Sequence, residues 1–303
     1  MDAAHPHGHP RHHAEDRVTG RRGLKAVLVL TAIFMIAEFV GGLLSNSLAL
    51  LADAAHMLTD VGAVGLSLFA LWFARRPATA GKTYGYLRFE ILAALVNGVT
   101  LTIIAGGIFY EAWRRLQAPP EVQSSLMLAV AVVGLVVNII AARFLHGAAG
   151  HNLNVRGAYL HVLGDLLGSV GAVAAAIVIL ATGWNTADPL ISIFVGILIL
   201  ISSWKLVRES VDVLLEAVPA HIDVDEVRRA IDDIPGVDEI HDLHVWTVTS
   251  GFTAMSGHAV VEDADRHQPI LEEIHRRMRE RFGIRHVTVQ LERRAMYDRE
   301  EHL

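Results

Sequence analysis

Two carboxylates and an imidazole interrupt a long apolar stretch in the first quarter of the chain. Asp53, His56 and Asp60 lie within residues 48–74, whose other side chains are nearly all apolar. On a helix these residues are three and four positions apart, so they share one face. A stretch this long is a candidate membrane span, where each ionisable group costs roughly 2.5–3.5 kcal/mol on insertion scales. Such groups usually face the protein interior, so this stretch predicts an intramembrane site.

A second apolar stretch repeats the arrangement. His161 and Asp165 are again four residues apart, within residues 157–182. Two imidazoles and two carboxylates have the number and type of ligands that a tetrahedral zinc ion takes. Metal binding needs deprotonated ligands and releases their protons, so metal and protons compete for such a site. The alternative is a hydrogen-bond cluster that only holds helices together, which two matching pairs with their flanking residues disfavour.

The composition divides the chain into a membrane part and a soluble part. Of its 303 residues, 52% are hydrophobic, and charged residues are sparse between residues 24 and 204 but dense afterwards. The formal net charge of −6 argues against general nucleic-acid binding. With no cysteine in the chain, any metal must be held by His, Asp or Glu. The predicted domains are a His-rich N-terminus over residues 1–23, a transmembrane domain over 24–214, a cytoplasmic domain over 215–292 and a tail over 293–303.

Six apolar segments are each close to the ~20 residues needed to cross a bilayer. They cover residues 24–44, 48–74, 89–113, 124–145, 157–182 and 189–207. Lys and Arg gather in the connections on the side of the two chain termini, so the positive-inside rule predicts that both termini are cytoplasmic. The expected fold class is therefore a multi-pass α-helical membrane protein with six transmembrane helices and a C-terminal α+β domain.

Four further polar residues lie in the predicted spans. They are Glu38, Glu90, Asn97 and Asn138. We interpret Glu90 and the two asparagines as partners in interhelical hydrogen bonds or as residues near the headgroups. Glu38 lies deeper in its span, and lining the ion path is the second interpretation for it.

Beyond residue 214 the pattern becomes that of a soluble domain. Helix signals cover residues 223–234 and 267–282, and strand signals cover residues 237–248, 252–262 and 286–292. An α-β-β-α-β order of this length predicts a small sheet with helices on one face.

Four motifs together resemble those of the cation diffusion facilitators, a family of zinc-type metal transporters. They are residues 47–56 with Asp60, 82–86 with Arg88 and Glu90, 154–161 with Asp165, and 241–246. The resemblance extends over residues 24–292. It implies a homodimer that exchanges metal for protons by alternating access, with a ferredoxin-like cytoplasmic domain.

The same resemblance implies a transport site between the second and fifth helices. Its residues are His56, Asp60, His161 and Asp165. In this family two His and two Asp accompany a preference for Zn²⁺ as substrate, while Cd²⁺, Co²⁺ and Fe²⁺ stay open. The partners implied are the divalent ion, protons, the lipid bilayer and a second copy of the chain.

The soluble domain offers candidates for a second metal site, where zinc would act as a regulator. The positions matching the family are His241, His244, His258, His286 and Glu292. Residues of neighbouring strands can converge on one face of a sheet. The alternative is that these are ordinary surface or half-buried histidines. Metal bound there would draw the cytoplasmic domains of two protomers together and favour the transport-competent state.

Three further features concern the N-terminus, one connection and the localisation. His5, His7, His9, His12 and His13 form either a weak metal-gathering tail or a segment without an essential role. Residues 75–87 contain neither His nor Asp, so we expect no further metal site in that connection. The short connections and the lack of a targeting segment favour the inner membrane of a bacterium.

The same ligand residues suggest two alternative functions. An intramembrane metalloenzyme needs an open coordination position and a general base, often within a His-Glu-x-x-His motif, which this sequence lacks. The chain is therefore not expected to be an enzyme. A membrane metal sensor of the same fold, which binds metal without net transport, stays open.

Overall fold

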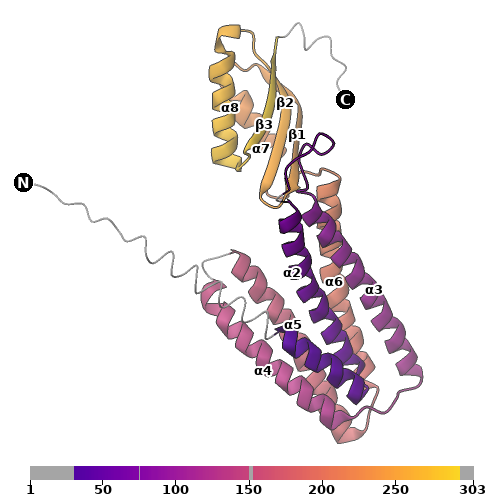
Figure 1. The fold of residues 1–303 in the computed structure, drawn as a ribbon. Coiled ribbons are helices and arrows are strands. Elements are labelled where there is room, and N and C mark those ends of the chain that lie inside the picture. The colour runs from indigo at the N-terminus through magenta and orange to yellow at the C-terminus, as the bar shows by residue number, and fades with distance from the viewer. Residues whose placement is uncertain (1–30, 75, 150–152, 294–303) are drawn as a thin grey trace, which may run out of the picture. The chain divides into compact units, whose positions relative to one another are not determined.

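The computed structural model describes residues 31–74, 76–149 and 153–293 (Figure 1). Apolar helices make up the first two thirds of this part. Their bounds are Thr31–Ser45, α2 over Leu48–Ala74, α3 over Phe89–Gln117, α4 over Ser124–Ala149, α5 over Leu153–Thr182 and α6 over Ala187–Leu214. These six helices correspond to the six predicted spans.

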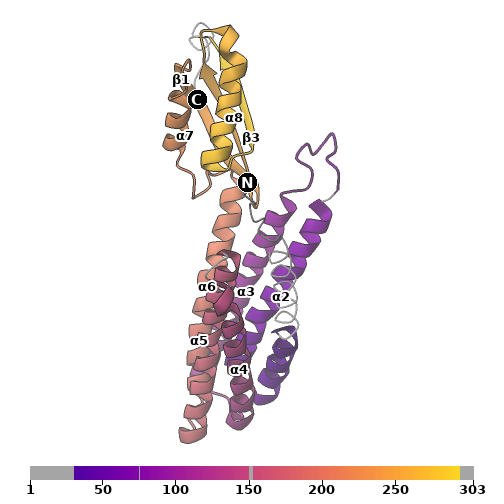
Figure 2. The same cartoon turned by 90° about the vertical axis from the view of Figure 1, so that its left-hand side faces the viewer.

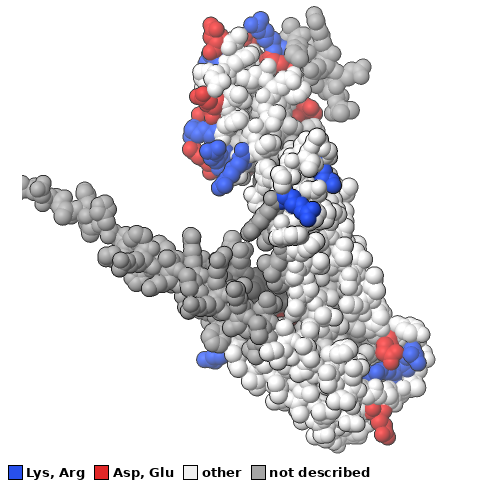
Figure 3. All heavy atoms as spheres, viewed as in Figure 1, with Lys and Arg blue, Asp and Glu red and all other residues white. Residues whose placement is uncertain are grey.

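Four of the described helices have the properties of membrane spans. Among the described residues α3 and α6 in full, and the greater part of α4 and α5, are long and apolar enough to cross a bilayer. Large apolar side chains lie on their outer surfaces, such as Ile103 at 70% exposed and Trp204 at 65%. On the face drawn in Figure 3, the helices carry almost no charged side chains between their ends. The chain is therefore an integral membrane protein.

The chain divides into two units, which are described separately. The first comprises the described part of Met1–Gly65 together with Asn97–Trp204. Within it, small side chains allow close packing of the first half of α2 against α4 and α5. This cluster contains Ala49, Leu50, Met127, Ala131, Ala172, Ala175, Ala176, Ile179 and Ala187. A second cluster packs Ala52 of α2 against α3 and α6. Helix α2 is thus fixed from both sides.

The second unit comprises Leu66–Val96 and the chain from Lys205 onward, including the predicted soluble domain. The elements of that domain are α7 over Val224–Asp232, β1 over Glu239–Thr249, β2 over Phe252–Val260, a 3-10 turn over Ala264–Arg266, α8 over His267–Phe282 and β3 over His286–Glu292. The sheet order is β1-β2-β3, with β1 antiparallel and β3 parallel to β2. The predicted α+β order is confirmed, and α8 and β3 have the predicted bounds.

Local signals explain these elements. The Asp223 side chain accepts hydrogen bonds from two backbone amides in the first turn of α7, as an N-cap does. Gly283 ends α8 in the left-handed conformation, where glycine carries no steric penalty. Ile270, Ile274 and Met278 recur at four-residue spacing and are buried against the sheet. Both helices lie on the same face of the sheet (Figure 2), so its other face has no helix packed against it.

Candidate metal centres

The intramembrane motifs meet between α2 and α5. His56 Nε2 lies 3.4 Å from Asp165 Oδ1, and the two side chains are 14% and 15% exposed. Two ligand atoms of a tetrahedral ion with bonds of about 2.1 Å are themselves about 3.4 Å apart. The pair is therefore already spaced as one edge of such a site, although 109 residues separate the two in the sequence.

The other two predicted ligands are only partly described. Asp60 is on α2, one turn after His56, and His161 is on α5, one turn before Asp165. Their side chains lie outside the described part of the structure. The geometry therefore brings together one imidazole and one carboxylate from opposite motifs.

Two more carboxyl groups are buried beside this pair. Glu38, at 1% exposed, contacts Asp53, which is three residues before His56 on α2. Glycines on neighbouring helices leave the room: a Cβ at Gly134 would lie 3.0 Å from Glu38 Oε1, and one at Gly168 would lie 3.7 Å from Asp53 Oδ1. Glu38 therefore lies with the acidic residues of α2 in the interior.

The remaining polar residues of the spans differ in their partners. Asn138 donates to Ser169 Oγ at 3.0 Å, which confirms the predicted interhelical hydrogen bond between α4 and α5. Glu90, at the start of α3, instead accepts hydrogen bonds from Thr249 at the end of β1 and from Ser250 in the turn that follows. The expectation for Glu90 was an interhelical hydrogen bond or a position near the headgroups; its hydrogen-bond partners belong to the soluble domain instead of to another span.

Three of the five candidate residues in the soluble domain converge. His241 on β1, His258 on β2 and Glu292 at the end of β3 each place one ligand atom within 4.8 Å of the others. His241 Nε2 contacts Glu292 Oε1 directly, and His258 Nδ1 lies 3.9 Å from the same oxygen. Glu292 is 2% exposed. His258 lies farther from Glu292 than the ~3.4 Å edge of a zinc tetrahedron, and His241 lies closer than that edge, so the three can share one ion once His241 and Glu292 part and His258 moves inward.

Strand pairing explains the convergence. His241 is directly opposite His258, and β3 pairs in parallel with β2 so that Glu292 is beside Val260, two residues further along. All three ligands therefore point to the face of the sheet that the helices leave open. The β1–β2 register shifts between His241 and His244, and Asp242 adopts a φ of +48° there. This bulge keeps both histidines on the same face although they are three residues apart.

The other two candidates lie elsewhere. His244 is 62% exposed, and its Nε2 is 2.9 Å from Asp242 Oδ1. His286 pairs with Ala254, four residues from His258 on β2, which is about 13 Å along the strand. Its ring instead lies 6.0 Å from that of Tyr84. Neither residue contributes to the cluster. The five histidines of the N-terminus lie outside the described residues.

Two family profiles cover nearly all of the chain. The cation efflux transmembrane domain matches residues 24–215, and the cytoplasmic domain of cation efflux proteins matches residues 219–294. The second match contains the His241, His258 and Glu292 cluster.

Similar proteins occur in several bacteria. The metal cation efflux system protein CzcD of Cupriavidus metallidurans is 45% identical over 293 residues, 96% of this chain and 90% of that protein. The cadmium, cobalt and zinc/H(+)-K(+) antiporter of Bacillus subtilis is 46% identical over 280 residues, 89% of this chain and 90% of that protein. The zinc transporter ZitB of Escherichia coli is 45% identical over 302 residues, 99% of this chain and 96% of that protein.

A solved structure matches a part of the chain. It is the metal-bound C-terminal domain of the CzcD transporter, 38% identical, covering 23% of this chain and 99% of that domain with a TM-score of 0.23. The profile over residues 24–215 spans well over half of the chain, and the relatives extend over nearly all of it. The chain therefore belongs to the cation efflux family, whose members are membrane transporters rather than enzymes.

Proposed function

We propose that this protein exports divalent metal ions, zinc foremost, in exchange for protons by alternating access. The ion is held between α2 and α5 by His56, Asp60, His161 and Asp165. The observation that carries the proposal is the 3.4 Å separation of His56 Nε2 and Asp165 Oδ1 between helices α2 and α5. The relatives named for zinc, cadmium and cobalt support these three metals as substrates, and none of those quoted is named for iron.

The chemistry follows from the ligand set. Two neutral imidazoles and two carboxylates give a dehydrated ion a complete N/O shell, so no position is left for a reactive water. The two negative charges neutralise a dication, which makes the loaded site tolerable in the membrane interior. Without metal the close carboxylates repel each other, so the empty site binds protons. Competition between metal and protons for the same atoms provides the coupling.

The topology and domains complete the proposal. Both termini are cytoplasmic, the transmembrane domain covers residues 24–214, the cytoplasmic domain covers 215–292 and a tail covers 293–303. The connections α3–α4 and α5–α6, and the one before α2, then face the extracytoplasmic side of a bacterial inner membrane. The protein works as a homodimer, for which the match to the family's cytoplasmic domain is the support.

The cytoplasmic cluster is proposed to be a regulatory metal site. His241, His258 and Glu292 supply two nitrogens and one oxygen, and water completes the shell. The burial of Glu292 favours its pairing with a cation, because an isolated buried carboxylate is costly. His244 and His286 are left out, because their positions do not support a share in this site.

Flux measurements test the proposal. Purified protein in vesicles is given an outward or inward pH gradient, and entry of Zn²⁺, Cd²⁺ and Co²⁺ is followed with an internal dye. We expect the direction of the pH gradient to set the zinc rate and His161→Ala to abolish it. Zinc flux that ignores the pH gradient would contradict antiport. Zinc binding without any flux would instead favour the sensor.

A further inference from the structure

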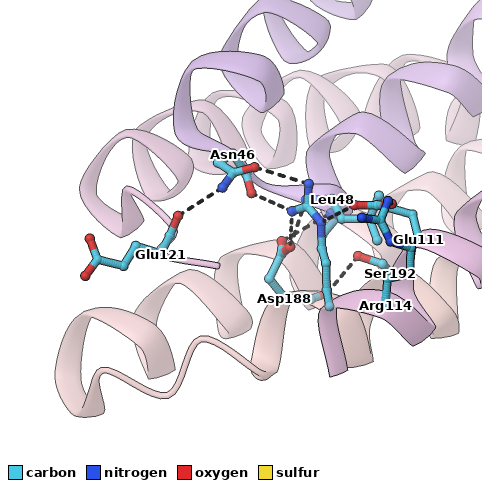
Figure 4. A network of polar contacts seen from close by, with 9 residues as sticks. Asn46, Leu48, Glu111, Arg114, Glu121, Asp188 and Ser192 are labelled. Atoms are coloured by element: carbon cyan, nitrogen blue, oxygen red, sulfur yellow. Dashed lines mark hydrogen bonds and ion pairs between the residues drawn. The ribbon is translucent and has the colours of Figure 1, made fainter. Parts of the chain in front are cut away.

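A buried carboxylate at the beginning of α6 caps the beginning of α2 (Figure 4). Asp188 is 0% exposed. Its carboxylate accepts hydrogen bonds from the Ser47 hydroxyl at 2.6 Å, the Leu48 amide at 2.8 Å and the Ala49 amide at 3.1 Å. The first amides of a helix have no partners within the helix, and its N-terminus favours negative charge. A residue 141 positions away in the sequence thus satisfies the first turn of α2.

An arginine on α3 joins the same network. Arg115 Nη1 lies 3.6 Å from Asp188 Oδ2 and donates to the Asn46 carbonyl oxygen at 2.7 Å. Its Nη2 donates to Asn46 Oδ1 at 3.2 Å, and the Asn46 amide group donates to the Glu121 carbonyl oxygen at 3.2 Å. The arginine side chain is only 12% exposed. The connections before α2, after α3 and before α6 are therefore held together around one buried ion pair.

The Asp188–Arg115 pair lies near the ends of the two helices that carry the transport ligands. His56 is eight residues after Leu48, which is about 12 Å along α2. Helix α5, which carries Asp165, ends at Thr182, and Asp188 follows only six residues later. The carboxylate therefore ties the outer ends of the two helices that bear the transport ligands.

We propose that Asp188 and Arg115 form an outer latch, which closes the transport site toward the extracytoplasmic side and must open for metal to leave there. The two are positioning residues, since neither contacts the ion. The inference rests on the proposed function, because only alternating access requires the outer ends of α2 and α5 to separate. Within this structure the latch is closed, with Ser45, Ser47 and Asp188 all fully buried.

A single introduced thiol tests the latch. The chain contains no cysteine, so Ala52→Cys carries its only thiol. Ala52 is fully buried on α2, one turn after Leu48 and one turn before His56. A membrane-impermeant methanethiosulfonate is applied from the extracytoplasmic side, and the rate of modification reports how often this part of α2 becomes accessible.

Two substitutions in the Ala52→Cys protein distinguish opening of the latch from a general loss of stability. Asp188→Asn keeps the shape but removes one acceptor for the α2 amides and the charge that lies 3.6 Å from Arg115, which keeps its ion pair with Glu111. We expect the modification rate to rise on the order of tenfold or more. Arg115→Gln should also raise it, which keeps the test valid if Asp188→Asn does not fold. Zinc affinity should stay within about twofold, because the ligands are distant from the change.

The matched control is Ser192→Ala. Ser192 is buried on the same helix and donates to the backbone carbonyl of Asp188 at 2.7 Å, without touching the carboxylate. The thiol introduced by Ala52→Cys should be modified at the same rate with Ser192→Ala as in the Ala52→Cys protein without it. The latch is refuted if folded Asp188→Asn and Arg115→Gln proteins are modified at the parental rate, or if Ser192→Ala accelerates modification as much. A wild-type protein that moves no metal would overturn the proposed transport without changing these rates.

Discussion

Removing His258 should separate the two metal centres. Its imidazole is one of three ligand groups in the cytoplasmic cluster, and His258→Ala leaves only His241 and Glu292, which already contact each other. An ion would then have to part that pair without gaining a third protein ligand. Loss of even an indirect ligand partner weakens metal sites by 10–100-fold, so we expect at least about 100-fold here. This corresponds to about 2.8 kcal/mol of binding free energy.

The assay is zinc binding to the full-length protein in buffers of fixed free zinc. Wild-type protein should bind an ion at each centre, while His258→Ala should lose the cytoplasmic one and keep the intramembrane one. His244→Ala is the matched control, since His244 is on the same face of the sheet but 62% exposed and bonded to Asp242. It should bind like wild type. Equal isotherms for wild type and His258→Ala, or equal losses in both variants, would refute the assignment.

Three further predictions concern other parts of the chain. Asp165→Asn should lower the initial rate of zinc flux at least about 100-fold in vesicles, with unchanged elution on size exclusion; a rate near wild type would contradict its place in the site. Hydrogen bonds from Arg276 and its neighbour lower the pKa of Glu273 to about 2, so its stabilisation of α8 is complete above pH ~4.5 and is lost as the pH falls toward 2. Hydrogen exchange of α8 amides, corrected for intrinsic rates, should therefore accelerate over this range, and Glu273→Gln should flatten the dependence. Gly134→Ala would place its Cβ 2.5 Å from an aromatic carbon and should cost about 1–3 kcal/mol in thermal unfolding, whereas Gly106→Ala meets nothing within 4 Å and should cost no stability.

The sequence predicts the helices and the strands well because their signals are local. Long apolar runs between turn residues give the spans, and four-residue spacing with a terminal glycine gives α8 its bounds at His267 and Phe282. The pairing of His56 with Asp165 could also be anticipated. Equivalent motifs in two spans indicate a shared site, and family resemblance places those spans next to each other.

Contacts that depend on register or on distant partners could not be predicted. The bulge at Asp242 and the pairing of β2 with β3 decide that His258 joins the cluster and His286 does not. Asp188 was missed because it precedes the predicted start of the sixth span and looks like an ordinary helix-start residue. The only sequence signal for its role is the Ser-Asn-Ser turn before α2, whose amides need an acceptor.

The most direct test of the central claim is the coordination shell of zinc in the membrane domain. X-ray absorption at the zinc edge should be measured on the His258→Ala protein, so that the intramembrane centre is the one occupied. The account predicts nitrogen and oxygen ligands at about 2.0–2.2 Å with outer-shell scattering from two imidazoles, and a fall of that scattering to about half in the additional variant His56→Ala, which keeps His161. A shell of oxygen ligands alone, or one unaffected by His56→Ala, would contradict it.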